Sequence, residues 1–411
     1  MKHINGMGCV ILCLCSLLLL NSCATTSDDD PSPLRQNLLQ ERWIAHMNNM
    51  APNGWTQSAD RWYFTGEPNQ TEREAVHAPI SDAMTIMAVR VSQFNKIHIT
   101  GNFQIQILGN QEKNTVFVLG SNEAVSQAAI AIRHHTLYVS QRDDCESCYK
   151  DVIVRIGINQ LNELCYTGDG SVTGRYIISD HLSIIASGYG NILLGGYMNV
   201  ADITQYGLGT VTIMDAYTPH LNIRVIGNGN LNMSGRMGVE QLIHAGNGQI
   251  NIVGADTHSL IIKTQGNGIT QIAGYADVRK LVALGNSQVY LYWVNSRKLQ
   301  LTEANHARVG LAGVVGDLHV SLYDHSWLGG QYLRSKNAYI TTQNASHGNV
   351  TASNKLFAAA QGNSSLYYFS APNRVSRFMS QKGIILPAGH SPMPMPTSTK
   401  PFAWNPPNHL N

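Results

Sequence analysis

The sequence predicts an all-β protein, a right-handed parallel β-helix built from repeats of about 20 residues. Three observations support this class. A short turn rich in Gly and Asn recurs at a nearly constant interval, the runs beside each turn alternate apolar and polar residues, and no helical pattern separates them. Self-similarity at a fixed short period indicates a repeat architecture. The turns begin at Gly168, Gly188, Gly207, Gly227, Gly246, Gly266, Gly285, Asn305, Asp324, Asn344 and Gly362.

Each repeat has the pattern of a strand, a corner and a second strand. In one copy, Leu221, Ile223 and Val225 alternate with polar residues, and the alternation resumes after the turn at 227–229. A period of two over a short run bounded by Gly and Asn is typical of a strand. Gly and Asn tolerate the positive φ angles that a sharp corner requires.

Stacked coils explain nearly identical turns better than a meander of hairpins does. In a solenoid the strands of each coil pair with those above and below, and the inward side chains form one apolar column. The right-handed winding follows from the general rule for parallel crossovers. One coil could hold a single repeat of about 20 residues or two unequal repeats with a total of about 39 residues. We predict the smaller coil, because a wide one is harder to fill, although this leaves the regular alternation of longer and shorter repeats unexplained.

The N-terminus predicts export and lipid anchoring. Residues 1–22 contain an apolar run of eleven residues from Val10 to Leu20, which is too short to span a membrane and suits a signal peptide. The following Leu20-Asn21-Ser22-Cys23 resembles the lipobox of bacterial lipoproteins, in which Cys23 would be acylated and would bind the membrane. Ala24 after the cysteine resembles the sorting rule for the outer membrane. The alternative is an ordinary secretory signal.

The remaining segments follow from composition. Residues 23–33 suit a flexible tether. Residues 34–87 form a predicted cap region, in which a short helix from about Pro33 to Met50 covers the end of the solenoid or contacts a membrane or partner. Residues 88–370 are the predicted β-helix, and residues 371–411 are a Pro-rich tail that we expect to be extended or disordered.

The charge balance argues against a nucleic-acid partner. Charged residues make up 13% of the chain, the formal net charge is +2, and the sequence shows no basic run or stripe. The Gly-rich turns are not followed by helices, so they do not suit dinucleotide binding, and they lack the recurring Asp of calcium-binding repeats. We expect no cofactor and no metal.

The segment from Val91 onward resembles the head domain of a family of auto-transporter adhesins known as the GIN domain. The resemblance rests on the run from Phe94 to Ile107, on 116–121 and 137–139, and on the Gly-rich repeats that follow. It implies a single-stranded parallel β-helix, commonly exported or lipid-anchored, with no established catalytic residues. This chain has more repeats than we expect of a typical member.

The mature chain would hold four cysteines, Cys23, Cys145, Cys148 and Cys165. Cys145 and Cys148 have the spacing of a metal knuckle or a redox motif, but a structural disulfide among the last three suits an exported protein better. Unpaired buried thiols and a metal site remain alternatives.

Aromatic residues punctuate the repeats, and stacked on one face they could bind a glycan or a protein. They could equally stabilise the sheets as ladders. Acidic residues stand singly in turn-like contexts, which does not favour catalysis. We therefore predict a lipid-anchored, non-catalytic binding or adhesion module of the cell envelope. The alternatives are a structural or self-assembling envelope scaffold and, less favoured, a polysaccharide-active β-helix enzyme. The residues of the candidate aromatic face are Tyr189, Tyr206, Tyr290, Tyr292, Trp293 and Trp327.

Overall fold

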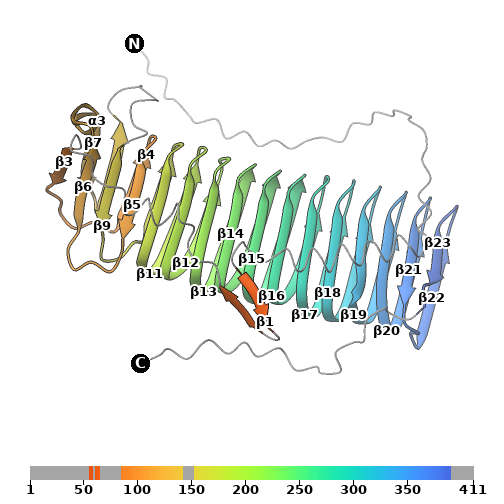
Figure 1. The fold of residues 1–411 in the computed structure, drawn as a ribbon. Coiled ribbons are helices and arrows are strands. Elements are labelled where there is room, and N and C mark those ends of the chain that lie inside the picture. The colour runs from red at the N-terminus through yellow and green to blue at the C-terminus, as the bar shows by residue number, and fades with distance from the viewer. Residues whose placement is uncertain (1–54, 59–60, 65–84, 142–151, 390–411) are drawn as a thin grey trace, which may run out of the picture. The chain divides into compact units, whose positions relative to one another are not determined.

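The structure is a computed structural model that describes residues 55–58, 61–64, 85–141 and 152–389 (Figure 1). The chain divides into two compact units, residues 1–80 and 81–411. In the first unit, β1 (Trp55–Ser58) and β2 (Arg61–Phe64) form an antiparallel hairpin. The second unit is a parallel β-solenoid of about twelve turns, which confirms the predicted fold class.

The solenoid begins with short elements, continues through long strands that each wind round most of a coil, and ends with short strands. The short elements at its start are β3 (Thr85–Val89), β4 (Lys96–Thr100), β5 (Gln104–Leu108), β6 (Thr115–Gly120), α3 (Asn122–Gln127), β7 (Ala128–Arg133), β8 (Thr136–Gln141), β9 (Ile153–Gly157) and β10 (Glu163–Thr167). The long strands are β11 (Ser171–Ser187), β12 (Asn191–Gln205), β13 (Thr210–Gly227), β14 (Asn230–Gly246), β15 (Gln249–Gly266), β16 (Ile269–Ala283), β17 (Gln288–Glu303), β18 (Arg308–Leu322), β19 (Trp327–Thr342) and β20 (His347–Ala360). The last strands are β21 (Ser365–Phe369), β22 (Arg374–Met379) and β23 (Ile384–Pro387).

Each coil holds one repeat. Ser171 pairs with Asn191, and Ser183 pairs with Asp202, so the offset between these neighbouring coils is one residue longer in the first half than in the second. The predicted single-repeat coil is therefore correct, and the coil of two repeats is excluded. Alternate side chains point inward and are almost completely buried, which produces one continuous apolar column along the solenoid.

The alternation of longer and shorter repeats has a local cause. In β13, Asp215 is an extra residue with φ +59°, and the strand resumes with Ala216. The next coil lacks that residue and places Gly235, with φ +134°, directly opposite Ala216. A Cβ on Gly235 would overlap the carbonyl oxygen of Ala216, so the short coil needs glycine at this bend. The same pairing of an extra positive-φ residue with a glycine in the next coil recurs at Tyr176 and Gly196, Gly254 and Gly274, and Trp293 and Gly313.

The three-residue turns form a stacked corner, as predicted. Where later repeats replace the first glycine, Asn305, Asp324 and Asn344 keep a positive φ of 58° to 65°. The third turn residue is matched in size to the inward side chain that it covers. A Cβ on Gly268 would overlap the buried ring of His244, whereas the smaller Thr264 and Ser287 share a hydrogen bond of 2.9 Å at the equivalent place.

Antiparallel elements cap the N-terminal end of the solenoid. The outermost coil is formed by β8 and β9, and the coil of β4 and β5 lies between it and the coil that continues into β11. The free edge of β8 is paired with β7, and that of β9 is paired with β6. The backbone hydrogen-bonding groups at both strand edges are therefore paired. The predicted capping helix lies outside the described residues, as do the signal peptide and the tether.

The solenoid extends further toward the C-terminus than we predicted. Strands β22 and β23 complete a last coil that reaches Pro387, beyond the predicted boundary at residue 370. Every residue of β22 is exposed, including Val375 and Met379, and the outer edges of β22 and β23 have no partner in the described part of the chain. Residues 390–411 of the predicted tail lie outside the described residues. No described helix is long and apolar enough to cross a membrane.

Candidate binding groove

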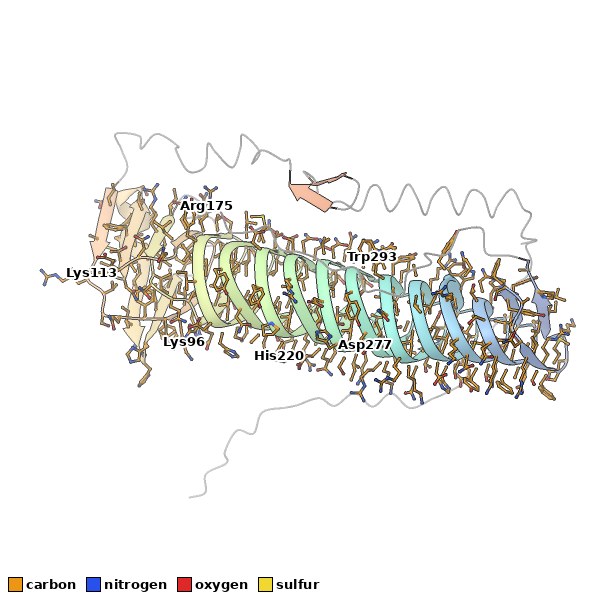
Figure 2. All side chains as sticks on the ribbon, turned by 90° about the horizontal axis from the view of Figure 1, so that it is seen from below. Lys96, Lys113, Arg175, His220, Asp277 and Trp293 are labelled. Carbon is orange, nitrogen blue, oxygen red and sulfur yellow. The ribbon has the colours of Figure 1, made fainter. Side chains whose placement is uncertain are left out.

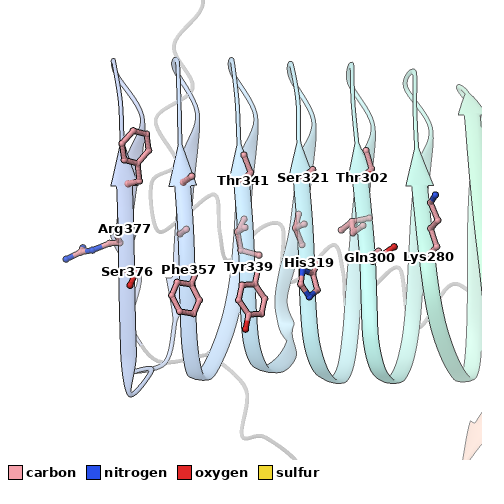
Figure 3. A pocket seen from close by; sticks show the side chains of 16 residues that line it. Lys280, Gln300, Thr302, His319, Ser321, Tyr339, Thr341, Phe357, Ser376 and Arg377 are labelled. Carbon is pink, nitrogen blue, oxygen red and sulfur yellow. The ribbon is translucent and has the colours of Figure 1, made fainter.

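The second halves of the strands from β16 to β20, together with β22, build a groove that runs along the solenoid (Figure 3). Its volume is about 680 Å³. Parallel register aligns the outward side chains of successive coils into rows. One row runs from Lys280 through Gln300, His319 and Tyr339 to Phe357.

Three aromatic rings of this row form one wall. The centroids of His319 and Tyr339 lie 4.7 Å apart with an interplanar angle of 13°, and those of Tyr339 and Phe357 lie 5.3 Å apart at 2°. These distances are close to the spacing between strands, so the stack follows directly from the coil rise. Because neighbouring rings cover each other's faces, the wall presents mainly ring edges. Only the ends of the stack have an uncovered face, and Phe357 is 41% exposed.

Small side chains form the floor beside the rings. The next outward row contains Thr302, Ser321, Thr341 and Ala359 in register. Their small size creates the depression, and three of them offer a hydroxyl group that can donate and accept hydrogen bonds. No carboxylate of the described residues lines the groove. Lys280 stands at one end, and Arg377 projects outward at the other (Figure 3).

The aromatic face predicted from the sequence contains none of the three residues of this wall. The available signal was their spacing, since His319, Tyr339 and Phe357 follow one another at close to the period of the repeat. The same spacing explains a second exposed stack, Tyr197 with Tyr217, whose centroids are 6.1 Å apart.

The structure does not bring the six predicted aromatic residues to one face. Tyr189 and Tyr206 are exposed near the Gly-rich corner. Trp293 is the extra residue at a bend and is exposed (Figure 2). These three therefore occupy two different edges of the coil.

The other three lie in the first half of the coil. Tyr290 points outward and donates a hydrogen bond of 2.9 Å to the side chain of Gln288. Trp327 is half-buried, and its ring covers Gly329, where a Cβ would lie 2.5 Å from the ring. Tyr292 is only 3% exposed although it does not belong to the apolar column, so its assignment to an exposed face was wrong. Leu291 belongs to the apolar column, whereas its neighbour Tyr292 does not.

The predicted disulfide falls mostly outside the described residues, because Cys145 and Cys148 lie there, as does the lipidation candidate Cys23. Cys165 is half-buried and its thiol forms no disulfide with a described residue. Burial, together with the nearby Glu163 carboxylate, raises the pKa of the Cys165 thiol, which favours the neutral form.

Glu163 belongs to a polar cluster at the capped end. It accepts a hydrogen bond of 3.0 Å from Lys96 Nζ and lies 2.5 Å from His98 Nε2. Burial alone would raise the pKa of Glu163, but the bonds to His98 and Lys96 outweigh it and lower the pKa. The cluster therefore behaves as an ion-pair network joining neighbouring strands. Among described residues, no three His, Cys, Asp or Glu side chains are placed to hold a metal ion.

Several proteins of known structure are similar to this chain, whereas a search of curated proteins found none that matches it. A putative adhesin from Bacteroides fragilis NCTC 9343 is 14% identical, with 75% of this chain and 98% of that chain covered and a TM-score of 0.23. A putative adhesin from Parabacteroides merdae ATCC 43184 is 12% identical, with 75% and 97% covered and a TM-score of 0.29. A putative lipid binding protein from Parabacteroides distasonis ATCC 8503 is 12% identical, with 75% and 98% covered and a TM-score of 0.25.

A protein-family model gives the more specific result. It matches residues 93–279, from the capped end into β16, and it describes the head GIN domain of a putative auto-transporter adhesin. The match covers the opening run and the regular Gly-rich repeats, the features on which the resemblance rested. Residues 93–279 of this chain therefore belong to the GIN domain family.

Proposed function

We propose that this protein is a lipid-anchored, non-catalytic binding module of the bacterial cell envelope, and that it acts as an adhesin. The observation that carries the proposal is the groove, a long open surface on which ring edges and hydroxyl groups repeat from coil to coil. Such a surface suits an extended ligand that makes the same contact several times. The adhesin description of the GIN family and the lipobox ending at Cys23 support the cell-surface part of the proposal.

The chemistry of the groove favours binding over cleavage. Enzymes that hydrolyse polysaccharides use a pair of carboxyl groups flanking the scissile bond. Among the described residues, the titratable side chains that line the groove are Lys280, His319, Arg377 and Tyr339, with no Asp or Glu. A ligand in this groove would therefore be held by hydrogen bonds and charge without a carboxylate acid or base beside it.

Binding arrays test the proposal. The mature chain should bind some members of a glycan array or an extracellular-matrix array, and Tyr339→Ser with Phe357→Ser should weaken that binding. The exposed stack at Tyr197 and Tyr217 offers the matched control, because Tyr197→Ser with Tyr217→Ser removes two stacked rings away from the groove. Silence on both arrays would overturn the proposal.

A second candidate function is a structural scaffold that assembles through the open C-terminal end. Strand β22 leaves its outer edge unpaired among the described residues and exposes Val375, Phe378 and Met379. Unpaired strand edges with apolar side chains favour association. Light scattering coupled to size exclusion would show oligomers that Met379→Lys disperses if this candidate is correct, and a strict monomer would exclude it.

A further inference from the structure

The coils that form the groove have a larger net positive charge than the chain as a whole. Residues 279–377 contain ten Lys and Arg against three Asp and Glu, whereas the whole chain has 28 against 26. One of the three acids, Glu303, is completely buried and does not reach the surface. The surface of these coils is therefore strongly cationic.

Three of the cations lie in one row of register partners beside the groove. Lys298, Asp317, Asn337, Lys355 and Arg374 are register partners in successive coils. These positions lie two residues before the row of the aromatic wall. At about 4.8 Å per coil, the six coils from β16 to β22 extend for roughly 24 Å. We call the following residues the cationic band: Arg279, Lys280, Arg297, Lys298, Lys336, Lys355 and Arg374.

No Lys or Arg of the cationic band forms an ion pair with a carboxylate of the described residues. The ion pairs of the described residues involve Lys96, His98, His220 and Arg236, which all lie outside the band. The acidic register partner within the band is Asp317, and its carboxylate accepts a hydrogen bond of 2.8 Å from Asn337. Lys355 and Arg374 are register partners in neighbouring coils, so their like charges repel one another, and an anion bound from solution would relieve that repulsion.

The groove beside the band indicates which kind of anion fits. Gln300, Thr302, Ser321 and Thr341 place amide and hydroxyl groups along it, which matches the many hydroxyl groups of a sugar chain. A single-stranded nucleic acid would need open ring faces on which its bases stack. Here the rings of His319, Tyr339 and Phe357 are closed against one another.

We propose that the groove and the cationic band together bind a linear acidic polysaccharide that lies along the solenoid axis. Its carboxylate or sulfate groups contact the cationic band, and its hydroxyl groups bond to the floor of the groove. This inference rests on the proposed binding function and specifies its ligand. Carboxylated and sulfated chains share the chemistry that the band recognises.

The test compares defined polymers with the mature chain. Polygalacturonate and dextran sulfate represent the two anionic groups, dextran is the neutral polymer, and phosphatidylglycerol vesicles and poly-dT are other polyanions. We expect one or both acidic polysaccharides to bind, with an affinity that falls as the salt concentration rises, and dextran not to bind. Lys298→Gln with Lys355→Gln should weaken binding about tenfold.

A matched control separates local contact from net charge. Lys113 and Arg175 are exposed near the capped end, away from the groove (Figure 2). Lys113→Gln with Arg175→Gln makes the same change in charge and should leave binding unchanged. Equal weakening by both double variants would overturn the inference, as would equally tight binding of vesicles or poly-dT. Binding of dextran alone would overturn it and leave the proposed function standing, whereas failure of every glycan and matrix ligand would remove both.

Discussion

Glu303 is the most unusual residue of the solenoid interior. It is the last residue of β17, and its side chain points into the apolar column between Ala283 and Leu322 of the neighbouring coils. It is fully buried, and neither carboxyl oxygen has a hydrogen-bond partner among the described residues. Within the same part of the chain, the hydroxyl of Ser326 is also unpaired. Burial raises the pKa of the Glu303 carboxyl well above its ordinary value of 4.5.

Replacing this carboxyl with an apolar group should stabilise the protein. Each unpaired buried polar group costs about 1–3 kcal/mol, and Leu322 shows that a leucine fits the same position one coil later. For Glu303→Leu we expect the free energy of unfolding to rise by roughly 2–4 kcal/mol at neutral pH. Glu303→Thr should also stabilise, because Thr264 and Ser287 hydrogen-bond at the corresponding positions, where Ser326 would be the new partner.

The pH dependence of stability provides a second, independent test of this reasoning. The pKa of Glu303 is higher in the folded state than in the unfolded state, so its contribution to stability is most favourable below pH 4.5. That contribution is lost progressively as the pH rises from there toward the folded pKa. The gain from Glu303→Leu should therefore grow with pH over this range.

Guanidinium unfolding followed by circular dichroism and tryptophan fluorescence, at several pH values between 5 and 9, measures both effects. The midpoint should be compared between variants, since solenoids can unfold through intermediates. Glu240→Leu is the control, because Glu240 is exposed and its replacement should change stability by less than about 0.5 kcal/mol. A lower midpoint for Glu303→Leu, or a gain that does not vary with pH, would refute the reasoning.

Three further predictions concern other parts of the chain. Gly268→Ala should lower the free energy of unfolding by more than about 1 kcal/mol, because the new methyl group overlaps the His244 ring. Gly195→Ala is the control in the same denaturation assay. Its new methyl group meets only Met214 Cε at 3.8 Å, so it should leave stability unchanged. Burial lowers the pKa of His244 from 6.5 to about 4. Roughly 2–3 kcal/mol of stability should therefore be lost as the pH falls through this interval. His244→Gln should remove that loss when unfolding is measured in acid titrations. Cys23→Ala should move the protein from the membrane pellet to the supernatant after cell fractionation, and continued pelleting would contradict lipid anchoring.

The backbone conformation of the solenoid was predictable because single residues at each corner determine it. Most corners need a positive φ at their first residue, which Gly, Asn and Asp adopt at low cost. At Gly168, Gly207 and Gly246 a Cβ would instead overlap the backbone of the neighbouring coil. The turns could therefore be found even after their sequences diverged. The cause of the alternating repeat length was not predictable. The extra residues Tyr176, Asp215 and Trp293 share a place in the coil and a positive φ, but no common side chain marks them.

The surface was harder to predict, since it depends on register between coils. Tyr292 was assigned to an exposed face, but it is only 3% exposed although it lies outside the apolar column, and the alternation along one strand does not show which outward side chains are covered. The wall of His319, Tyr339 and Phe357 consists of three residue types, so only their spacing marks it. Similarly, no basic run exists in the linear sequence, yet the winding of the coils brings lysines and arginines from distant parts of the sequence into one band.

The division between fold and binding surface follows from the physics of a solenoid. Each coil is stabilised mainly by its two neighbours, so coils can be added without altering those already present. The GIN family model ends at residue 279, and the groove begins with Lys280. The later coils keep the corners and the apolar column but place rings, hydroxyls and cations on their outer rows. Because an outer row repeats a contact at every coil, it is suited to a partner that is itself a repeating chain. Recognition by this protein is therefore expected to depend on the coils beyond the shared family region, and deleting charge there should change ligand binding without changing the fold.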